Sequence, residues 1–190
     1  VISVNDAYGE GVAWEFLKIA PARQVTTVAH ERYARTDTNV LAQVLKAIAS
    51  RPDAVLVIAA GTPAALPAKQ LRERGFTGKI YFTDGVVNDD FLRIGGRGVE
   101  GAFLPSGLFV AARQLPDSNP SKAVALDFIK KHDAAFAPGT ANHFSGHTWT
   151  VGLILQSAVP HALKKGKPGT PEFRKGLRDG LEMAKELVTA

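Results

Sequence analysis

The sequence predicts an α/β fold in which a parallel sheet carries helices on both of its faces. Segments typical of strands alternate with segments typical of helices over residues 1–85, and this alternation favours βαβ units. The run "AVLVIAA" at 54–60 lacks polar alternation, which is typical of a strand covered on both faces. The chain has 190 residues, of which 45% are apolar and 22% charged, so it is long enough and apolar enough to bury a core.

The first strands and the first helix follow one another closely. We expect a short buried strand at 1–4, a loop at 5–11 and a helix at 12–20. Apolar residues of that helix recur three or four positions apart: Val12, Phe16 and Ile19. Residues 24–33 are rich in β-branched side chains and predict a second strand.

Two further helices and two further strands complete the alternation. After the capping sequence "ARTDT", the apolar spacing over 39–50 predicts a helix that ends before Pro52. Another helix is expected at 62–75, with Thr62 as its N-cap, Pro63 in its first turn and Gly75 as its stop. A strand is expected before it at 54–60, and residues 79–85 after it are expected to form another strand and a polar loop.

A glycine pattern at 95–101, "GGRGVEG", has the spacing of a dinucleotide-binding turn. In that turn the glycines follow a strand and open a helix, whereas here a short helix is expected before them at 88–95 and a buried strand after them at 102–107. Because this order is reversed, we expect no nucleotide cofactor, and a Rossmann-like oxidoreductase is the least favoured function.

The character of the sequence changes after Ser106. A turn-rich linker at 115–120 precedes three segments with helical patterns, at 121–136, 147–165 and 170–188, and Pro160 is expected to kink the second of them. That segment is apolar nearly all round near Trp149, so we expect it to be buried against another element. We therefore expect an α/β lobe at 1–106, and at 107–190 the helical part of another lobe that is incomplete.

Several functional classes are disfavoured by composition and motifs. The chain has no cysteine, so thiolate chemistry, disulfides and cysteine-rich zinc sites are excluded. The net charge of +5 comes from scattered basic residues, and the densest group lies at a probable helix end, so no nucleic-acid partner is expected. Ser106 and Ser145 lack the Gly-x-Ser-x-Gly elbow of a hydrolase.

His143 and His147 stand four positions apart, which is the spacing of two zinc ligands on one helix face. No Glu follows the first of them, and Gly146 would weaken the helix between them. The interpretation favoured from sequence is therefore two polar residues at a helix start, with no metal bound.

Ligands of parallel α/β sheets bind beyond the carboxyl ends of the strands, which selects the loops at 5–11, 60–64 and 83–89. In the first loop, Tyr8 could pack on a ligand beside the acidic residues Asp6 and Glu10. In the last, Asp84 could hold a ligand ammonium by a charge-assisted hydrogen bond, or could simply form an Asp-Gly turn. The spacing leaves both interpretations of Asp84 open.

Taken together, "NDAYGEG", "ERYARTDTNVLAQVLKAIASRPDAVLV", "AAGTPAALPAKQLRERGFTGKIYFTDGV", "FLRIGGRGVEGAFLP" and "GTPEFRKGLRDGLE" resemble the leucine/isoleucine/valine-type substrate-binding proteins of ABC transporters. The resemblance extends along essentially the whole chain, in order. It implies the type I periplasmic-binding fold, in which two α/β lobes close over a ligand. On this resemblance, residues 1–106 are most of the second lobe and residues 107–190 are returning helices of the first.

The resemblance also implies a set of ligand-binding residues. Tyr8 matches the aromatic residue that lies against the ligand, Asp84 matches the acidic partner of the α-amino group, and Phe144 falls near an aromatic of the side-chain pocket. Gly61 and Thr62 stand where amino-acid binders often carry a tyrosine, which departs from the branched-chain pattern. The implied ligand is an amino acid, an amide or a related small carboxylate.

The function implied is the extracytoplasmic, periplasmic solute-binding component of an ABC importer, with a membrane permease as its partner. It needs no catalytic residue and no cofactor, so we expect a protein that is not an enzyme. The alternative is a ligand-sensing regulator or receptor domain of the same fold. The chain opens on "VISV" without Met and resembles only part of the family's length. We therefore expect it to self-associate or to retain a missing fragment.

Overall fold

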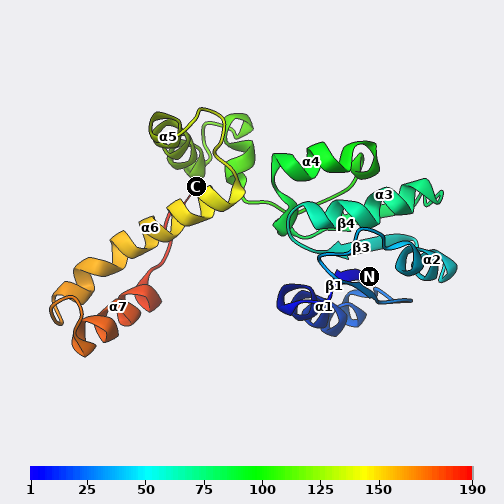
Figure 1. The fold of residues 1–190 in the computed structure, drawn as a ribbon. Coiled ribbons are helices and arrows are strands. Elements are labelled where there is room, and N and C mark those ends of the chain that lie inside the picture. The colour runs from blue at the N-terminus through cyan, green and yellow to red at the C-terminus, as the bar shows by residue number, and fades with distance from the viewer. Residues whose placement is uncertain (190) are drawn as a thin grey trace. The chain divides into compact units, whose positions relative to one another are not determined.

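The computed structural model describes residues 1–189. The chain divides into two compact units, Val1–Ser106 and Gly107–Ala190, both drawn in Figure 1. Among the described residues, no helix is both long and apolar enough to cross a membrane.

The first unit is built on a four-stranded sheet in which every pairing is parallel. The strand order is β2-β1-β3-β4. In register, Ile2 lies opposite Glu31 on one side and Val57 on the other. The strands are β1 (Ile2–Val4), β2 (Glu31–Tyr33), β3 (Ala54–Ile58) and β4 (Lys79–Phe82). The parallel sheet predicted from the alternating pattern is therefore confirmed.

Helices cover both faces of this sheet, as predicted. They are α1 (Ala7–Ile19), α2 (Leu41–Ala49), α3 (Ala65–Glu73) and α4 (Asp89–Gly95). Figure 1 shows α1 on one face, while α2 and α3 contact each other on the opposite face. The core is apolar and nearly free of solvent, with Val4, Val57, Leu71 and Ile80 all fully buried. Burial of these side chains provides the main stabilising term for the unit.

Helix α1 begins earlier than the sequence suggested. Residues 5–11 were expected to form a loop, but the Asp6 carboxylate accepts a hydrogen bond of 2.9 Å from the Gly9 amide and caps a helix that starts at Ala7. A capped N-terminus satisfies a backbone amide that would otherwise lack a partner. Tyr8 consequently lies in the first turn of α1 rather than in a loop.

The second strand is shorter than predicted. Only Glu31–Tyr33 of the expected segment 24–33 pairs with the sheet. Of the preceding residues, Ala29 accepts a hydrogen bond of 2.8 Å from the Val1 amino group without extending the strand. Val25 and Val28 are accordingly exposed.

The buried strand expected at 102–107 is not formed as predicted. Phe103 makes one isolated parallel bridge with Tyr81, and its side chain is 50% exposed although its ring stacks on that of Tyr81. No element of the first unit covers this edge, so the apolar run remains open to solvent. The glycines before it follow α4 and form a 3-10 turn at Gly96–Val99, so they do not open a helix after a strand.

The second unit is helical. After a 3-10 segment at Leu108–Gln114 come α5 (Pro120–Ala135), α6 (His143–Leu163) and α7 (Pro171–Met183). Its small core joins Phe109, Ala112, Ala125 and Phe128, against which Trp149 packs. Small residues allow α6 and α7 to approach closely, since a Cβ added at Gly180 would lie 2.9 Å from the Ala158 carbonyl oxygen.

The apolar surface of α6 was expected to be buried, and this expectation is only partly met. Trp149 is half-buried, but Val151 is 54% exposed and Leu155 is 39% exposed. A helix that is apolar nearly all round needs partners on more than one side. Helices α5 and α7 cover only part of its circumference.

Candidate ligand-binding site

The strand order creates a switch point at one edge of the sheet. From β1 the chain proceeds to β2 on one side, and then returns to β3 on the other side. The connections that follow β1 and β3 therefore lead to opposite sides of the sheet, and in such folds the ligand crevice lies at this switch point, outside the carboxyl ends of the strands. The segments after β2 and β4 border the same edge.

Arg35, just beyond β2, connects this crevice across β1. Its Nη2 and Nε atoms donate to Oδ2 of Asp6 at 2.5 and 3.1 Å, and its Nη1 donates to the Ala60 carbonyl at 2.9 Å. Asp6 follows β1 and Ala60 follows β3. The guanidinium, whose donors lie in a rigid plane, thus links the segment after β1 to the segment after β3.

A second set of hydrogen bonds joins the first turn of α1 to the end of β4. The Tyr8 hydroxyl donates to the Thr83 hydroxyl at 2.8 Å and lies 3.4 Å from Oδ1 of Asp84. Thr83 in turn donates to the Ala59 carbonyl at 3.3 Å. Hydrogen bonds linked in this way polarise one another, so the tyrosine is oriented as well as packed.

Gly85 is required where these segments meet. A Cβ at this position would lie 2.9 Å from the Ala60 Cβ and 3.1 Å from the Tyr8 hydroxyl oxygen. Its carbonyl accepts a hydrogen bond of 2.8 Å from the Gly61 amide. Gly61 itself has a φ of +70°, a conformation that favours glycine. The two glycines allow the loops after β3 and β4 to lie in direct contact.

The charge states of the site follow from these contacts. The hydrogen bond from the Gly9 amide, followed by that from Arg35, lowers the pKa of Asp6 below its ordinary value of 3.8. Burial raises the pKa of Tyr8 above 10.0. At neutral pH the site therefore contains an ionised Asp6 and a protonated Tyr8 that can donate.

Four of the five residues predicted to contact a ligand lie at this edge. Tyr8 and Asp84 are within hydrogen-bonding range of each other, while Gly61 and Thr62 follow β3. The prediction that Thr62 caps a helix is wrong: it lies in a 3-10 turn at Thr62–Ala64, because α3 begins only at Ala65. Phe144, the fifth residue, belongs to the first turn of α6 in the second unit and is 50% exposed. Contact of these residues with a ligand stays a prediction.

Sequence reasoning missed Arg35 and Thr83. Arg35 lies in "ARTDT", which was interpreted only as a capping sequence for the next helix, although it follows a strand and so reaches the same edge. Thr83 directly precedes Asp84, which was predicted to bind the ligand. In both cases the position after a parallel strand was the available signal.

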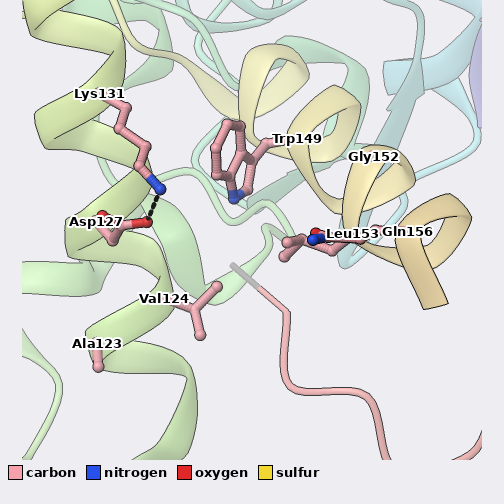
Figure 2. A pocket seen from close by; sticks show the side chains of 8 residues that line it. All are labelled: Ala123, Val124, Asp127, Lys131, Trp149, Gly152, Leu153 and Gln156. Atoms are coloured by element: carbon pink, nitrogen blue, oxygen red, sulfur yellow. Dashed lines mark hydrogen bonds and ion pairs between the residues drawn. The ribbon is translucent and has the colours of Figure 1, made fainter.

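The second unit contributes a pocket that the sequence did not suggest. It has a volume of about 530 Å³ and lies between α5 and α6 (Figure 2). Lys131 at its rim pairs with Asp127 at 2.7 Å, and its Nζ lies 5.2 Å from the centre of the Trp149 ring. The other lining residues are mostly small or apolar: Ala123, Val124, Gly152, Leu153 and Gln156.

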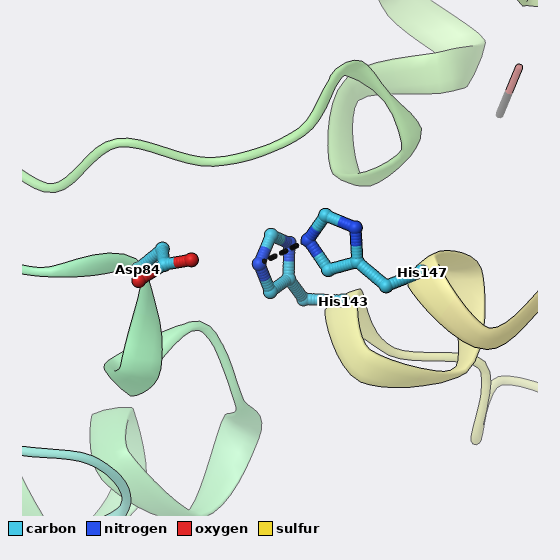
Figure 3. A group of neighbouring side chains, drawn as sticks. All are labelled: Asp84, His143 and His147. Atoms are coloured by element: carbon cyan, nitrogen blue, oxygen red, sulfur yellow. Dashed lines mark hydrogen bonds between the residues drawn. The ribbon is translucent and has the colours of Figure 1, made fainter. Parts of the chain in front are cut away.

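At the start of α6 the imidazoles of His143 and His147 face each other, with 2.8 Å between their Nε2 atoms (Figure 3). His143 is only 4% exposed. The helix start is fixed by Asn142 and Ser145, whose side chains each bind the other's backbone amide. Ser145 therefore acts in a capping box, a role consistent with the absence of a hydrolase motif around it.

Comparison with known proteins identifies the family. A family model described as "Periplasmic binding protein" matches residues 1–185. Among solved structures, an extracellular ligand-binding receptor from Rhodopseudomonas palustris HaA2 is 44% identical with a TM-score of 0.90, over 99% of this chain and 52% of that one. Among curated proteins, none matches.

More distant structures share the fold. A leucine-binding protein from Thermotoga maritima has 22% identity and a TM-score of 0.70, and a putative branched-chain amino acid ABC transporter from Rhodospirillum rubrum has 24% and 0.69. Each match covers 95% of this chain and 48% of the other. The chain thus spans about half the length of the structures it matches. On the extent of the family match, and on an α/β fold of the type I class, the chain belongs to the periplasmic binding protein family.

Proposed function

We propose that this chain is part of an extracytoplasmic solute-binding protein that delivers a small amino acid, or a related amide or carboxylate, to an ABC permease. The observation that carries the proposal is the placement of Tyr8 and Asp84, 3.4 Å apart, at the carboxyl edge of a parallel sheet. An aromatic ring beside a carboxylate suits a ligand that has an apolar part and an ammonium group.

Charge selects among the ligands. A carboxylate at Asp84 attracts an ammonium through a charge-assisted hydrogen bond and repels an anion that has no compensating cation. Asp6, although also acidic, is already neutralised by Arg35 at 2.5 Å. We assign the ammonium to Asp84 because it follows β4 at the carboxyl edge of the sheet, beside the ring of Tyr8, which would provide a packing surface. Gly61 and Thr62 would let the loop after β3 approach the ligand, and Phe144 keeps the role that the resemblance implies. An amino acid is therefore the preferred ligand, and an amide would bind the same carboxylate through its neutral N–H donors.

Binding of this kind needs no catalytic group. In a two-state receptor the ligand stabilises a closed form by its differential affinity, and a permease then recognises that form. The Arg35 and Tyr8 hydrogen bonds hold the loops of the first unit before a ligand arrives, which reduces the entropy lost on binding. The protein would act as a carrier rather than as an enzyme.

Relatives support the class of ligand without fixing its identity. One distant structure carries the words leucine-binding protein, and another is described as a putative branched-chain amino acid transporter. The more similar structures are described only as extracellular ligand-binding receptors. A sensory receptor of the same fold is the second candidate. A signal peptide and a neighbouring permease gene would favour transport, whereas an attached kinase or DNA-binding domain would favour sensing.

The proposal is tested by thermal unfolding of the full-length protein with pairs of ligands. Each L-amino acid is compared with its deaminated analogue, such as leucine with 4-methylpentanoate, which keeps the carbon skeleton and the carboxylate. We expect an amino acid to raise Tm, by an amount equivalent to about 2.7 kcal/mol at a concentration of about 100 Kd, and its analogue to have little effect.

The matched variants are Asp84→Asn and Asp90→Asn. Asp90 lies in the first turn of α4 and pairs with Arg93 on the surface, so its substitution controls for the loss of one negative charge. Asp84→Asn should abolish the amino-acid shift, and Asp90→Asn should preserve it. Equal shifts from an amino acid and its deaminated analogue would contradict the assigned ligand class.

A further inference from the structure

We propose that His143 and His147 form a binding site for one divalent transition-metal ion that favours tetragonal coordination, namely Cu²⁺ or Ni²⁺. Four positions apart on α6, the two side chains lie on one face of the helix, and their Nε2 atoms converge (Figure 3). The sequence favoured two ordinary polar residues at a helix start. The convergence of the two nitrogens in the folded unit favours a pair of metal ligands instead.

The distance between the nitrogens indicates the kind of ion. Imidazole nitrogens bind such metals at about 2.0–2.1 Å, so two ligands at a right angle lie about 2.9 Å apart, while two at a tetrahedral angle lie about 3.3 Å apart. The observed separation is 2.8 Å, and the two nitrogens share a hydrogen bond, so the donor imidazole must carry its proton on Nδ1 before both Nε2 atoms can bind an ion. This distance matches neighbouring positions of a square-planar or octahedral site, the geometry typical of Cu²⁺ and Ni²⁺ with nitrogen ligands.

The surroundings hold the imidazoles in place. His143 is 96% buried, and the ring of Phe144 meets it edge-on at 5.6 Å. On the other side, Gly146 packs against Phe109, so a Cβ there would lie only 3.0 Å from the ring. Gly146, which the sequence suggested would weaken the helix, therefore allows α6 to pack closely against Phe109. Ligands fixed before binding lose less entropy when the ion arrives.

The side of the pair that faces solvent is the side of His147. Gly107 lies beside both rings, where an added Cβ would stand 3.9 Å from Cε1 of His143 and 4.0 Å from Cε1 of His147, at ordinary van der Waals distance. Because His147 is exposed, an ion can reach the pair from solvent. Water would complete the coordination sphere, as is usual where a protein supplies few ligands.

The test is titration of the tag-free protein with Cu²⁺, followed by electron paramagnetic resonance of the bound ion. We expect about one equivalent of Cu²⁺ to bind. Its spectrum should be axial, as for tetragonal Cu²⁺, and should show coupling to two imidazole nitrogens. His147→Gln removes one ligand, and because His147 is exposed, the substitution should not disturb the fold. Because the second imidazole binds as an intramolecular ligand, this variant should lower affinity about 100-fold.

His161→Gln is the matched control, since His161 lies in the last turn of the same helix. It should leave the affinity and the spectrum unchanged. The inference is overturned if His147→Gln binds Cu²⁺ as tightly as the natural sequence, if its spectrum keeps both nitrogens, or if His161→Gln removes the site. These measurements need no organic ligand, so they are independent of the proposed transport function.

Discussion

The hydroxyl of Tyr8 donates a hydrogen bond of 2.8 Å to the hydroxyl of Thr83, and so links the first turn of α1 to the end of β4. The two residues are 75 positions apart in the sequence. Because β1 and β4 are separated by β3 in the sheet, this contact crosses the switch point at which we place the ligand. Tyr8 is therefore held in position by the protein itself.

Substitution of Tyr8 should separate its two roles. Tyr8→Phe removes the hydrogen bond but keeps the ring, so we expect a loss of about 1 kcal/mol in the stability of the first unit and little change in ligand affinity. Tyr8→Ala should in addition weaken ligand binding strongly. Urea unfolding and calorimetric ligand binding measure the two effects, and a double-mutant cycle with Thr83→Val should show coupling. Additive effects would argue against the bond.

Arg35 should control the order of the loops around the crevice. Arg35→Gln removes the contacts with Asp6 and the Ala60 carbonyl, so we expect faster hydrogen exchange in residues 5–8 and 60–62. Arg32→Gln is the control, because Arg32 binds Glu10 at 2.6 Å, and Glu10 lies outside both measured segments. Unchanged exchange in Arg35→Gln would show that the loops are ordered by other contacts.

The packing of α1 on β1 depends on one glycine. A Cβ at Gly9 would lie 1.9 Å from the carbonyl oxygen of Val4, so Gly9→Ala should displace the helix and cost about 2 kcal/mol or more. Gly11 lies in the same helix with no atom near its missing Cβ. Gly11→Ala should therefore stabilise the protein by about 0.5–1 kcal/mol. Chemical unfolding of the two variants should give opposite signs, and matching signs would contradict this packing.

His30 should make stability depend on pH. Burial, with repulsion from Arg32, lowers the pKa of His30 below its ordinary value of 6.5, and its Nε2 lies 2.8 Å from the hydroxyl of the fully buried Ser3. The unfolded chain then binds the proton more readily. The stability contributed by neutral His30 is fully present above pH 6.5 and is lost as the pH falls through the lower folded-state pKa.

Urea unfolding at about pH 7.5 and about pH 5.5 measures this loss. His30→Gln should reduce the difference in stability between the two pH values, and His161→Gln, at a half-buried position in the last turn of α6, should not. An unchanged pH dependence in His30→Gln would assign the effect to other groups.

The exposed apolar face of α6 should promote association. Val151 and Leu155 present 54% and 39% of their surfaces to solvent, and contiguous apolar surface of this kind marks an interaction site or an aggregation risk. We expect the 190-residue chain to self-associate or to retain a partner fragment, and Val151→Ser to reduce this association. Leu92→Ser, at an exposed residue of α4, is the control. Light scattering of a clean monomer in the natural sequence would contradict the prediction.

Local pattern was sufficient for most of the fold. The continuous apolar run of β3 and the helical spacing of α2 were recognisable because each reflects burial along a regular element. Pattern failed where pairing depends on partners. Residues 25–30 and 102–107 have the composition of strands, but the backbone of the first segment makes only one hydrogen bond to the start of β1, and the second pairs with β4 only at Phe103.

The site was predictable only in part, for a related reason. The position of Asp84 after a strand pointed to the carboxyl edge, as did that of Tyr8. The link from Arg35 to both Asp6 and Ala60 depends on the strand order, because it exists only when β1 lies between β2 and β3. Likewise, the convergence of the His143 and His147 nitrogens depends on side-chain rotamers that spacing alone does not determine.

The most direct test of the central claim, that Asp84 selects a ligand carrying an ammonium group, is native mass spectrometry of the full-length protein. The complex is kept intact in the first measurement and is then denatured, and the released small molecule is identified. We predict an amino acid or an amide with a free amine. Release of an aromatic or aliphatic carboxylate without an amine would contradict the role assigned to Asp84.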